Sequence, residues 1–353
     1  MMKPTLLIAS TFLPPICGGA ERVAWEIAKR VANRFEIHII TTGEGSPAIK
    51  ELVELHTVPR VRWMPITYST IYRSQIEKVL NDVSPDIIHC HMTLPWGYIL
   101  RNTPTSKVIT CHEGGVPTRV DRYFINSAMH HANVITTPSN WSSQYIEENY
   151  GRKPLTIPNG VDTGTFRSIP EIQRHDNVVL YVGRFMRNKG ALDLVEAARA
   201  LPEYEFWFAG GVDPRNVGRQ RVEIPSMPNV KAIEFIPDRD ALASLYNQAT
   251  ICAFPSQYEN FPLVGLEAMA CGRTLVATKG PRNGYSEYVQ NGSDGLLIEP
   301  HDVNALVEAI KYLMENVSVR EEFEQNASKK VKQYDWGIIA EKYAALLEAL
   351  VHR

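Results

Sequence analysis

The sequence of 353 residues is long enough for two domains, since a single core seldom grows beyond roughly 250–300 residues. Its composition is that of a globular protein, with 44% hydrophobic and 22% charged residues. The formal net charge of -2 argues against nucleic acid as the main partner, because binding to phosphates requires a basic surface.

The cysteines and the apolar runs predict a cytoplasmic protein. The opening run Thr5–Ser10 is short and leads into Pro14 and Pro15, so we expect a buried strand and no export signal. No apolar run reaches the ~18 residues that a membrane helix needs. The cysteines are odd in number and scattered, which is typical of reduced thiols: Cys17, Cys90, Cys111, Cys252 and Cys271.

Short apolar runs alternate with helical periodicity in the first half of the chain. The stretch Glu21–Ala32, for example, places Val23, Ile27 and Val31 on one helical face. The apolar runs are Leu6–Ser10, Glu36–Thr41, Asp86–Cys90, Lys107–Cys111 and Asn133–Thr137. Strands that alternate with helices in this way predict a parallel, doubly wound α/β sheet.

The second half repeats this alternation and predicts a second sheet. Its apolar runs are Val178–Val182, Glu205–Ala209, Val230–Phe235, Thr250–Phe254, Thr274–Ala277 and Gly295–Ile298. The polar stretch Thr163–Asp176 is typical of a linker, so we predict domains over residues 1–165 and 166–335. The last helix, residues 336–353, could cap the second domain or cross back to the first. Two such domains are expected to bind ligands in a cleft at their carboxyl strand edges.

The segment Glu259–Gly272 carries two carboxylates around the start of a predicted helix. Pro262 suits a first helical turn and Gly272 suits the helix end. The free N–H groups and dipole of a helix N-terminus attract an anion such as a diphosphate. On spacing alone, Glu259 and Glu267 could equally be ordinary surface residues.

With its surroundings, this segment resembles the E-x7-E motif of the retaining GT-B glycosyltransferases of family 4. Further matches run along the whole chain: Gly18–Glu21, Pro158–Asp162, Val182–Arg184, Lys189-Gly190 and Asn291–Leu297. The resemblance implies two Rossmann-like domains, an amino-terminal acceptor domain and a carboxyl-terminal donor domain. It also implies transfer of a hexose from a nucleotide sugar with retention of the anomeric configuration. The acceptor would attack from the leaving-group face, and a donor phosphate oxygen would take the proton.

The resemblance also assigns roles to single residues. Arg184 and Lys189 would neutralise the diphosphate, a task that suits permanent cations on one loop. Glu259 would contact sugar hydroxyls, Glu267 the ribose, and His112 the donor sugar, so the catalytic set is His112, Arg184, Lys189 and Glu259. Backbone at Gly18 and Gly19 would approach the donor closely. The remaining donor contacts are Ile236, Asn260, Phe261, Leu263 and Val264.

Two positions depart from the family pattern. Pro262 stands where the family usually has glycine, and proline offers no N–H to the donor. The stretch from Lys279 to Glu287 is longer than expected, so the sugar pocket is expected to differ in shape.

No metal or other cofactor is expected for the transfer reaction. His89, Cys90, His91, Cys111 and His112 are close in sequence or in predicted sheet position. Cys90 would point away from His89 and His91, however, and no C-x-x-C spacing occurs.

The donor is expected to be a UDP-hexose or GDP-mannose, and the acceptor a glycan, a lipid-linked molecule or a small molecule. Aromatic and basic residues mix over Arg60–Arg73, including Arg62, Trp63 and Tyr68, which suits contact with the inner face of a membrane. A strand and helix packed on the sheet would give the same pattern, and we favour that interpretation. Two alternative functions remain open: a nucleotide-sugar 2-epimerase, and a non-catalytic nucleotide-sugar-binding protein.

Overall fold

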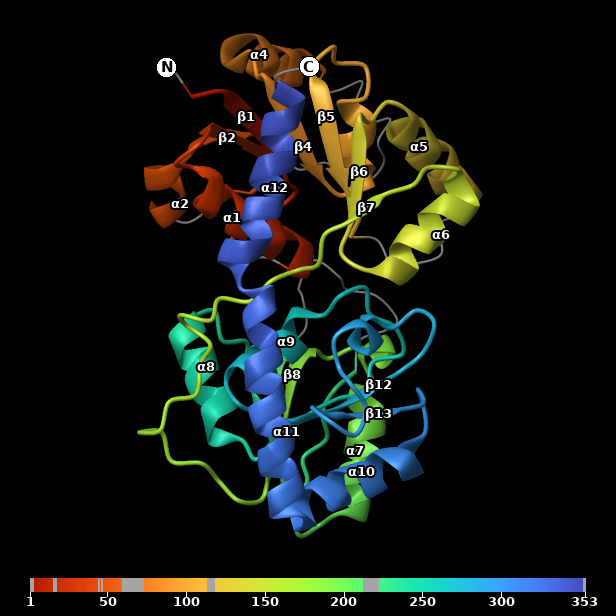
Figure 1. Ribbon diagram of the computed structural model, residues 1–353. Coiled ribbons are helices and arrows are strands. Elements are labelled where there is room, and N and C mark those ends of the chain that lie inside the picture. Colours follow the sequence, from red (N-terminus) through yellow and green to blue (C-terminus); the bar gives the residue numbers. More distant parts are fainter. Residues whose placement is uncertain are drawn as a thin grey trace. The chain divides into compact units, whose positions relative to one another are not determined.

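The computed structural model describes residues 3–14, 18–43, 45, 47–58, 73–112, 118–211 and 222–351. The chain divides into two compact units, one of Met1–Asn159 with Trp336–Arg353 and the other of Gly160–Asp335. In each unit helices cover both faces of a sheet (Figure 1). Cys17, Glu113–Gly115 and the aromatic and basic stretch up to Tyr72 lie outside the described residues.

The first unit contains a parallel sheet in the order β3-β2-β1-β4-β5-β6-β7. Its strands are β1 (Thr5–Ala9), β2 (Glu36–Thr41), β3 (Glu54–Thr57), β4 (Ile87–His91), β5 (Ser106–Thr110), β6 (Val134–Thr137) and β7 (Leu155–Thr156). Its helices are α1 (Gly19–Val31), α2 (Pro47–Leu52), α4 (Arg73–Val83), α5 (Arg119–His130), α6 (Asn140–Tyr150) and α12 (Trp336–Val351). The strand order reverses between β1 and β4, which creates a switch point where such sheets bind ligands.

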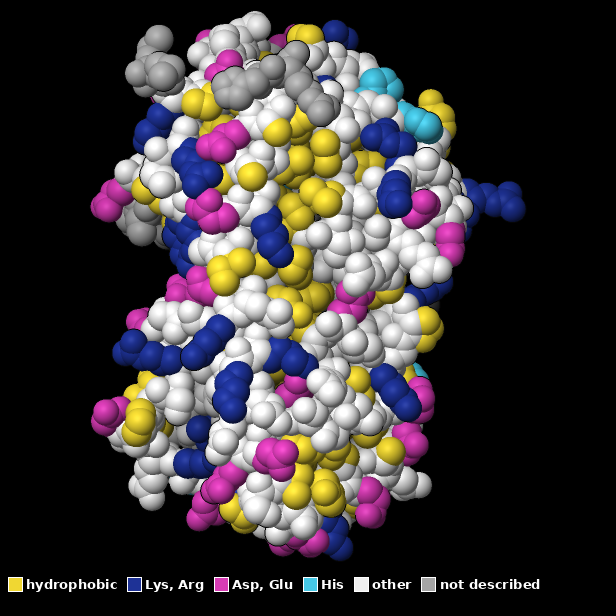
Figure 2. Space-filling view, in the orientation of Figure 1, with side chains coloured by type: hydrophobic (Ala, Val, Ile, Leu, Met, Phe, Trp, Pro, Cys, Tyr) yellow, Lys and Arg dark blue, Asp and Glu magenta, His cyan; other side chains and the backbone are white. Residues whose placement is uncertain are grey.

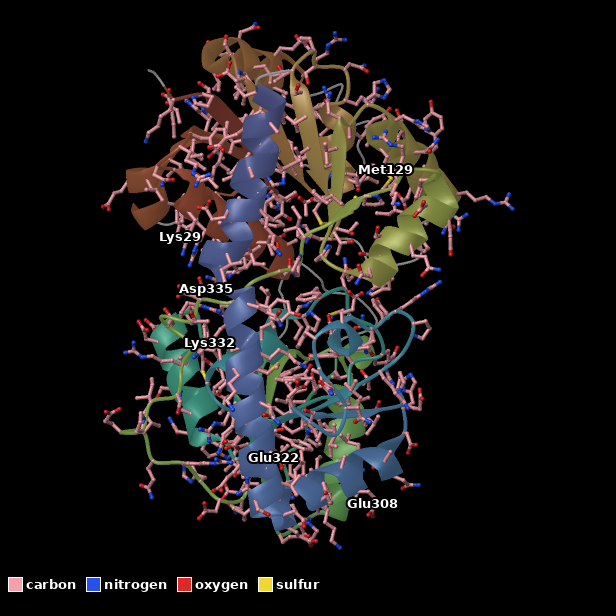
Figure 3. The ribbon with its side chains drawn as sticks, in the orientation of Figure 1. Lys29, Met129, Glu308, Glu322, Lys332 and Asp335 are labelled. Atoms are coloured by element: carbon pink, nitrogen blue, oxygen red, sulfur yellow. The ribbon has the colours of Figure 1, made fainter. Side chains whose placement is uncertain are left out.

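The C-terminal helix α12 belongs to this first unit and lies beside α1 (Figure 1). Tyr343 and Leu347 of α12 are buried against the sheet, because this helix presents an apolar stripe to it. On the outer side of α12, Arg34 forms an ion pair with Glu341, with 2.6 Å between Arg34 Nη2 and Glu341 Oε2. Asp335, labelled in Figure 3 just before α12, is the last residue of the second unit. Its carboxylate accepts hydrogen bonds from the backbone N–H and the side chain of Thr163 in the same unit.

The second unit contains a parallel sheet in the order β10-β9-β8-β11-β12-β13. Its strands are β8 (Val178–Arg184), β9 (Glu205–Gly211), β10 (Val230–Ile233), β11 (Ile251–Phe254), β12 (Leu275–Thr278) and β13 (Leu296–Ile298). Its helices are α7 (Ala191–Ala200), α8 (Arg239–Gln248), α9 (Leu263–Ala270), α10 (Val303–Glu315) and α11 (Val317–Lys330). The order reverses between β8 and β11.

Two hydrophobic layers sandwich the second sheet. Along β9, Phe206 and Phe208 join one layer, whereas Trp207 and Ala209 join the other. Successive residues of a strand point to opposite faces, so a strand buried on both sides reads as an unbroken apolar run. This is why the sequence predicts these strands.

All eleven apolar runs predicted as strands form strands, with ends that differ by at most two residues. The prediction missed β3 and β7. The first is a short edge strand with polar residues, and the second has only two residues. The segment Thr163–Asp176, predicted as a linker, contributes Phe166 to the core of the second unit, where this side chain is 1% exposed.

Among the described residues, no helix combines the length and apolarity that crossing a bilayer requires. Acidic and basic side chains are interspersed over the face shown in Figure 2, without a large region of one sign. This distribution agrees with the near-zero net charge of the sequence.

Candidate functional site

The predicted basic pair follows the first strand of the second unit. Strand β8 is two residues longer than predicted, so Arg184 is its last residue and has an exposed side chain. The Tyr181 hydroxyl donates to the Arg184 carbonyl at 2.9 Å and fixes the strand end. Burial, and next the nearby Glu259 carboxylate, raise the pKa of Tyr181, so this hydroxyl stays protonated and remains a donor.

A tight turn then places Lys189 at this edge of the sheet. Residues Arg187–Lys189 form one 3₁₀ turn, and Gly190 follows with φ 70°. A Cβ at Gly190 would lie 2.0 Å from the Pro255 carbonyl oxygen, so only glycine fits both the conformation and the contact. Asn188 donates to the Tyr258 hydroxyl at 3.0 Å, which docks the turn on the loop after β11.

Lys189 and Glu259, predicted separately, form an ion pair. Lys189 Nζ lies 2.7 Å from Glu259 Oε1, and the two side chains are 16% and 15% exposed. The pair therefore keeps a cation and a carboxylate in contact while both remain accessible to a ligand. Losing either partner would leave a largely buried charge without compensation.

The Glu259 backbone is held by the stretch that departs from the family pattern. Its N–H donates to the Arg282 carbonyl at 3.2 Å, and its own carbonyl accepts from Gly284 N–H at 2.8 Å. Asn283 is buried between them, and its side-chain amide donates to the Ser256 carbonyl at 3.1 Å. The loop after β12 thus clamps the main chain that carries Glu259. The sequence analysis predicted a different loop shape at this position but not this contact.

Helix α9 begins one residue later than predicted, with Pro262 as its N-cap and Leu263 as its first residue. The Tyr288 hydroxyl donates to the Pro262 carbonyl at 2.9 Å. A Cβ at Gly265 would lie 2.2 Å from that hydroxyl, so the glycine makes room for it. Pro262 costs no helical hydrogen bond, and the N–H groups of the first turn have no helical acceptor.

The other predicted donor contacts surround this helix start or precede α8. Asn260 and Phe261 lie on the loop before α9, and Leu263 and Val264 in its first turn. The Phe261 side chain is buried and packs against Tyr288, with ring centroids 5.1 Å apart, so only its backbone could face a ligand. Ile236 is half-buried on the loop between β10 and α8.

Glu267 is buried in the second turn of α9 and already has two partners. The Arg239 guanidinium pairs with Oε1, and the Tyr246 hydroxyl donates to Oε2 at 3.2 Å. Burial, and to a smaller extent the Glu267 carboxylate, raises the pKa of Tyr246, so its hydroxyl stays protonated. Sequence reasoning missed Arg239, which begins α8, 28 residues before Glu267.

Gly18 and Gly19 stand at the start of α1 in the first unit, after β1. Gly18 is the N-cap, and its N–H donates to the Glu21 side chain at 2.9 Å. A Cβ at Gly19 would meet no described atom within 4 Å. Packing among the described residues therefore does not require glycine at position 19.

His112 follows β5 and belongs to a group of three histidines. His112 Nε2 lies 3.2 Å from His91 Nδ1, and the rings of His89 and His91 have centroids 4.2 Å apart. His89 Nε2 lies 2.7 Å from the Thr110 hydroxyl. Burial lowers the pKa of His112 to about 4. Burial, and to a smaller extent the nearby His112, lowers the pKa of His89 to about 3. Both rings are therefore neutral at pH 7.

The described structure therefore joins Lys189 to Glu259 directly and places both near the start of the helix that carries Glu267. Arg184 lies at the end of the strand before Lys189. His112, Gly18 and Gly19 belong to the first unit. Cys90, Cys111, Cys252 and Cys271 are buried free thiols.

Comparison with known proteins identifies the family. The model described as glycosyl transferases group 1 matches residues 162–330, and that of glycosyltransferase family 4 matches residues 17–165. An uncharacterized glycosyltransferase of Methanocaldococcus jannaschii is 26% identical over 350 residues, which cover 95% of each chain.

Two further proteins are similar over different lengths. The N,N'-diacetylbacillosaminyl-diphospho-undecaprenol alpha-1,3-N-acetylgalactosaminyltransferase of Campylobacter jejuni is 29% identical over 49% of this chain and 45% of its own. The HepE protein of Anabaena, solved in complex with UDP-glucose, superposes with a TM-score of 0.80 at 20% identity over 98% of this chain and 99% of its own. The chain therefore belongs to the group 1 glycosyltransferases and has the GT-B fold.

Proposed function

We propose that this enzyme moves a hexose from a nucleotide diphosphate sugar to an acceptor, with retention of the anomeric configuration and without a metal ion. The observation that carries the proposal is the Lys189–Glu259 pair near the start of α9. It combines, at the carboxyl edge of one parallel sheet, a cation, a carboxylate and first-turn N–H groups that have no acceptor within the helix. These are the groups that a diphosphate and a sugar require.

In the proposed complex the donor diphosphate contacts Lys189, Arg184 and the first turn of α9. Breaking the glycosidic bond leaves negative charge on the diphosphate, and two fixed cations stabilise that charge. Glu259 then accepts hydrogen bonds from sugar hydroxyls with the lone pairs that Lys189 does not use, since a carboxylate offers about four. This division of roles lets one pair bind both halves of the donor.

The Glu267 carboxylate is proposed to bind the ribose hydroxyls. Arg239 and Tyr246 use part of its hydrogen-bonding capacity and fix its orientation, which reduces the entropy lost on binding. For His112, Gly18 and Gly19 we keep the roles that the family resemblance implies. Because His112 Nε2 faces His91, the Nδ1 of this neutral ring is the nitrogen that remains for a sugar hydroxyl.

Retention is proposed to proceed by attack on the leaving-group face. Glu259 is paired with Lys189, and Glu267 is buried beside Arg239, so neither is a free nucleophile for a covalent intermediate. The bond between the anomeric carbon and the phosphate oxygen breaks as the acceptor oxygen bonds to that carbon. The acceptor proton passes to a phosphate oxygen of the departing nucleotide. Trapping a glycosyl-enzyme would contradict this route.

The donor and acceptor classes are supported by similar proteins. The solved HepE protein holds UDP-glucose, and the Campylobacter relative is named for transfer to an undecaprenol-linked acceptor. We therefore propose a UDP-hexose or GDP-mannose as donor, and a glycan, a lipid-linked molecule or a small molecule as acceptor.

A thermal-shift panel with UDP-glucose, UDP-GlcNAc, UDP-galactose, GDP-mannose and ADP-glucose tests the proposal. A ligand that binds the folded state raises the melting temperature, so one clear shift identifies the donor. Conversion of that donor to an epimer without acceptor would favour the 2-epimerase. Binding without hydrolysis or transfer to any acceptor would favour a non-catalytic protein. No shift with any nucleotide sugar, beside a working positive control, would contradict the proposal.

A further inference from the structure

Two neighbouring strands at the edge of the first sheet carry the same short pattern, a glutamate two residues before a histidine. Strand β2 has Glu36 and His38, and strand β3 has Glu54 and His56. In the parallel register His38 lies opposite Glu54. Opposed residues of parallel strands share a face, as do residues two apart on one strand. All four side chains therefore lie on the same face of the sheet.

The distances within this group fit one shared ion. His38 Nδ1 and His56 Nε2 are 3.0 Å apart. Glu54 Oε2 lies 3.6 Å from His38 Nδ1, and Glu54 Oε1 lies 3.9 Å from His56 Nε2, and both distances are too long for a hydrogen bond. Neighbouring ligand atoms in a tetrahedral zinc site, with bonds of about 2.0–2.2 Å, are about 3.3–3.5 Å apart. One ligand atom from each of the three side chains lies within 4.8 Å of the other two, so small side-chain shifts would let them surround a single ion.

The surroundings prepare the His38 ring for such a role. Glu36 lies at the other edge of this ring, with Oε1 3.7 Å from Nε2. Carboxylates therefore flank both ring nitrogens of His38 without a hydrogen bond to either, so the ring is able to present Nδ1 to an ion shared with His56 and Glu54. The side chains of His38, His56 and Glu54 are 9%, 15% and 66% exposed. An ion can therefore enter from solvent past Glu54.

We propose that His38, His56 and Glu54 bind a divalent transition-metal ion, with Zn²⁺ as the preferred ion. Two imidazole nitrogens and one carboxylate suit zinc, whereas Ca²⁺ and Mg²⁺ prefer oxygen ligands alone. Three protein ligands leave the fourth position for water. The ion joins the short edge strand β3 to β2 and so stabilises the first unit. None of these residues belongs to the proposed donor site, so the proposal does not depend on the proposed function.

Zinc titration of the full chain, freed of any polyhistidine tag and first stripped with a chelator, tests the site. Competition with a chromophoric chelator should give one Zn²⁺ per chain, and zinc should raise the melting temperature. Glu54→Gln, a change at an exposed position, should weaken binding on the order of 10–100-fold. His56→Gln should abolish both zinc binding and the visible absorption of bound Co²⁺. His130→Gln, an exposed histidine on α5, serves as the control and should bind like the wild type.

Two results would overturn the proposal. One is the absence of saturable zinc binding by the wild type. The other is equal zinc affinity in the wild type and in Glu54→Gln, with metal-free melting temperatures that show both to be folded. Thermal shifts with nucleotide sugars on the same variants keep the two proposals apart, because those shifts should be unchanged whether zinc binds or not.

Discussion

Lys189 Nζ and Glu259 Oε1 lie 2.7 Å apart although 70 residues separate them in the chain. The two segments follow adjacent strands, β8 and β11, whose carboxyl ends meet at one edge of the sheet. Each side chain neutralises the other until a ligand offers competing partners. The pair is therefore both a structural contact and the centre of the proposed donor site.

Replacing Lys189 by alanine should reduce turnover strongly and should also lower stability, because the largely buried Glu259 carboxylate loses its cation. Loss of one contact to transition-state charge costs about 3 kcal/mol, which is about two decades in kcat. Lys311→Ala is a matched control, because this lysine is exposed and lies 4.0 Å from Glu315 on one helix. Steady-state kinetics and urea unfolding of both variants measure the two effects. Full activity of Lys189→Ala would remove this residue from the mechanism.

Replacing Glu259 by alanine should mainly lower kcat, whereas Glu267→Ala should mainly raise the KM for the donor. A contact to the transferred sugar strengthens as the bond breaks, but a contact to the ribose is the same in the ground and transition states. Initial rates over a range of donor concentrations separate the two parameters. The opposite pattern would show that the two roles are exchanged.

Arg239→Ala should destabilise the protein, because it leaves the buried Glu267 carboxylate without its cation. Breaking a buried pair costs about 3–5 kcal/mol, and the partial exposure of Arg239 places the expected loss nearer 2 kcal/mol. The double variant Arg239→Ala with Glu267→Gln should recover part of this loss, because glutamine carries no charge. Urea unfolding of the two single variants and the double variant gives the coupling energy. Additive losses would mean that the two side chains do not interact in solution.

The sequence predicted most of the fold because buried parallel strands consist of apolar runs, as in Phe206–Ala209. It missed β3 because the edge strand Glu54–Thr57 has only four residues, of which Leu55 alone is apolar. In the candidate site, motif spacing identified Lys189 and Glu259 but could not show that they form a pair. Arg239 and Asn283 have no local signal, since their contacts depend on loops that only the folded sheet brings together.

Gly190→Ala should destabilise the second unit and displace Lys189. A side chain in the left-handed region costs about 1–2 kcal/mol, and the clash with the Pro255 carbonyl should add a similar amount, about 3 kcal/mol in all. Gly292 has a similar φ of 76°, but a Cβ there would meet no described atom within 4 Å. Gly292→Ala should therefore show only the conformational cost. Equal losses in both variants would contradict the role given to the Pro255 contact.

Gly19→Val should impair donor binding with little loss of stability. No described atom lies within 4 Å of a Cβ at this position, so the described packing predicts no clash, whereas a ligand that approaches the backbone would meet the new side chain. Gly19→Ala should have a smaller effect of the same kind. Thermal-shift titration with the identified donor measures binding, and the melting temperature without ligand measures stability. Unchanged donor affinity in Gly19→Val would exclude close approach at this glycine.

Acidification should destabilise the protein through its buried histidines. The pKa of His89 is about 3 in the folded chain, against an ordinary value of 6.5. Burial, and to a smaller extent the neighbouring His112, disfavours the charged form of this ring. Between these pH values the unfolded chain binds a proton that the folded chain does not. The free energy of unfolding therefore falls as the pH falls, by about 1.4 kcal/mol per pH unit and about 2 kcal/mol at pH 5.

Urea unfolding at several pH values between 7.5 and 5 (a range of about two and a half units) measures this slope. His89→Asn should reduce the loss of stability between pH 7.5 and pH 5 by about 2 kcal/mol, even if the variant is less stable throughout, because asparagine does not titrate. A His89→Asn slope equal to that of the wild type would mean that His89 is protonated in the folded chain, and that the ring accommodates charge despite its burial.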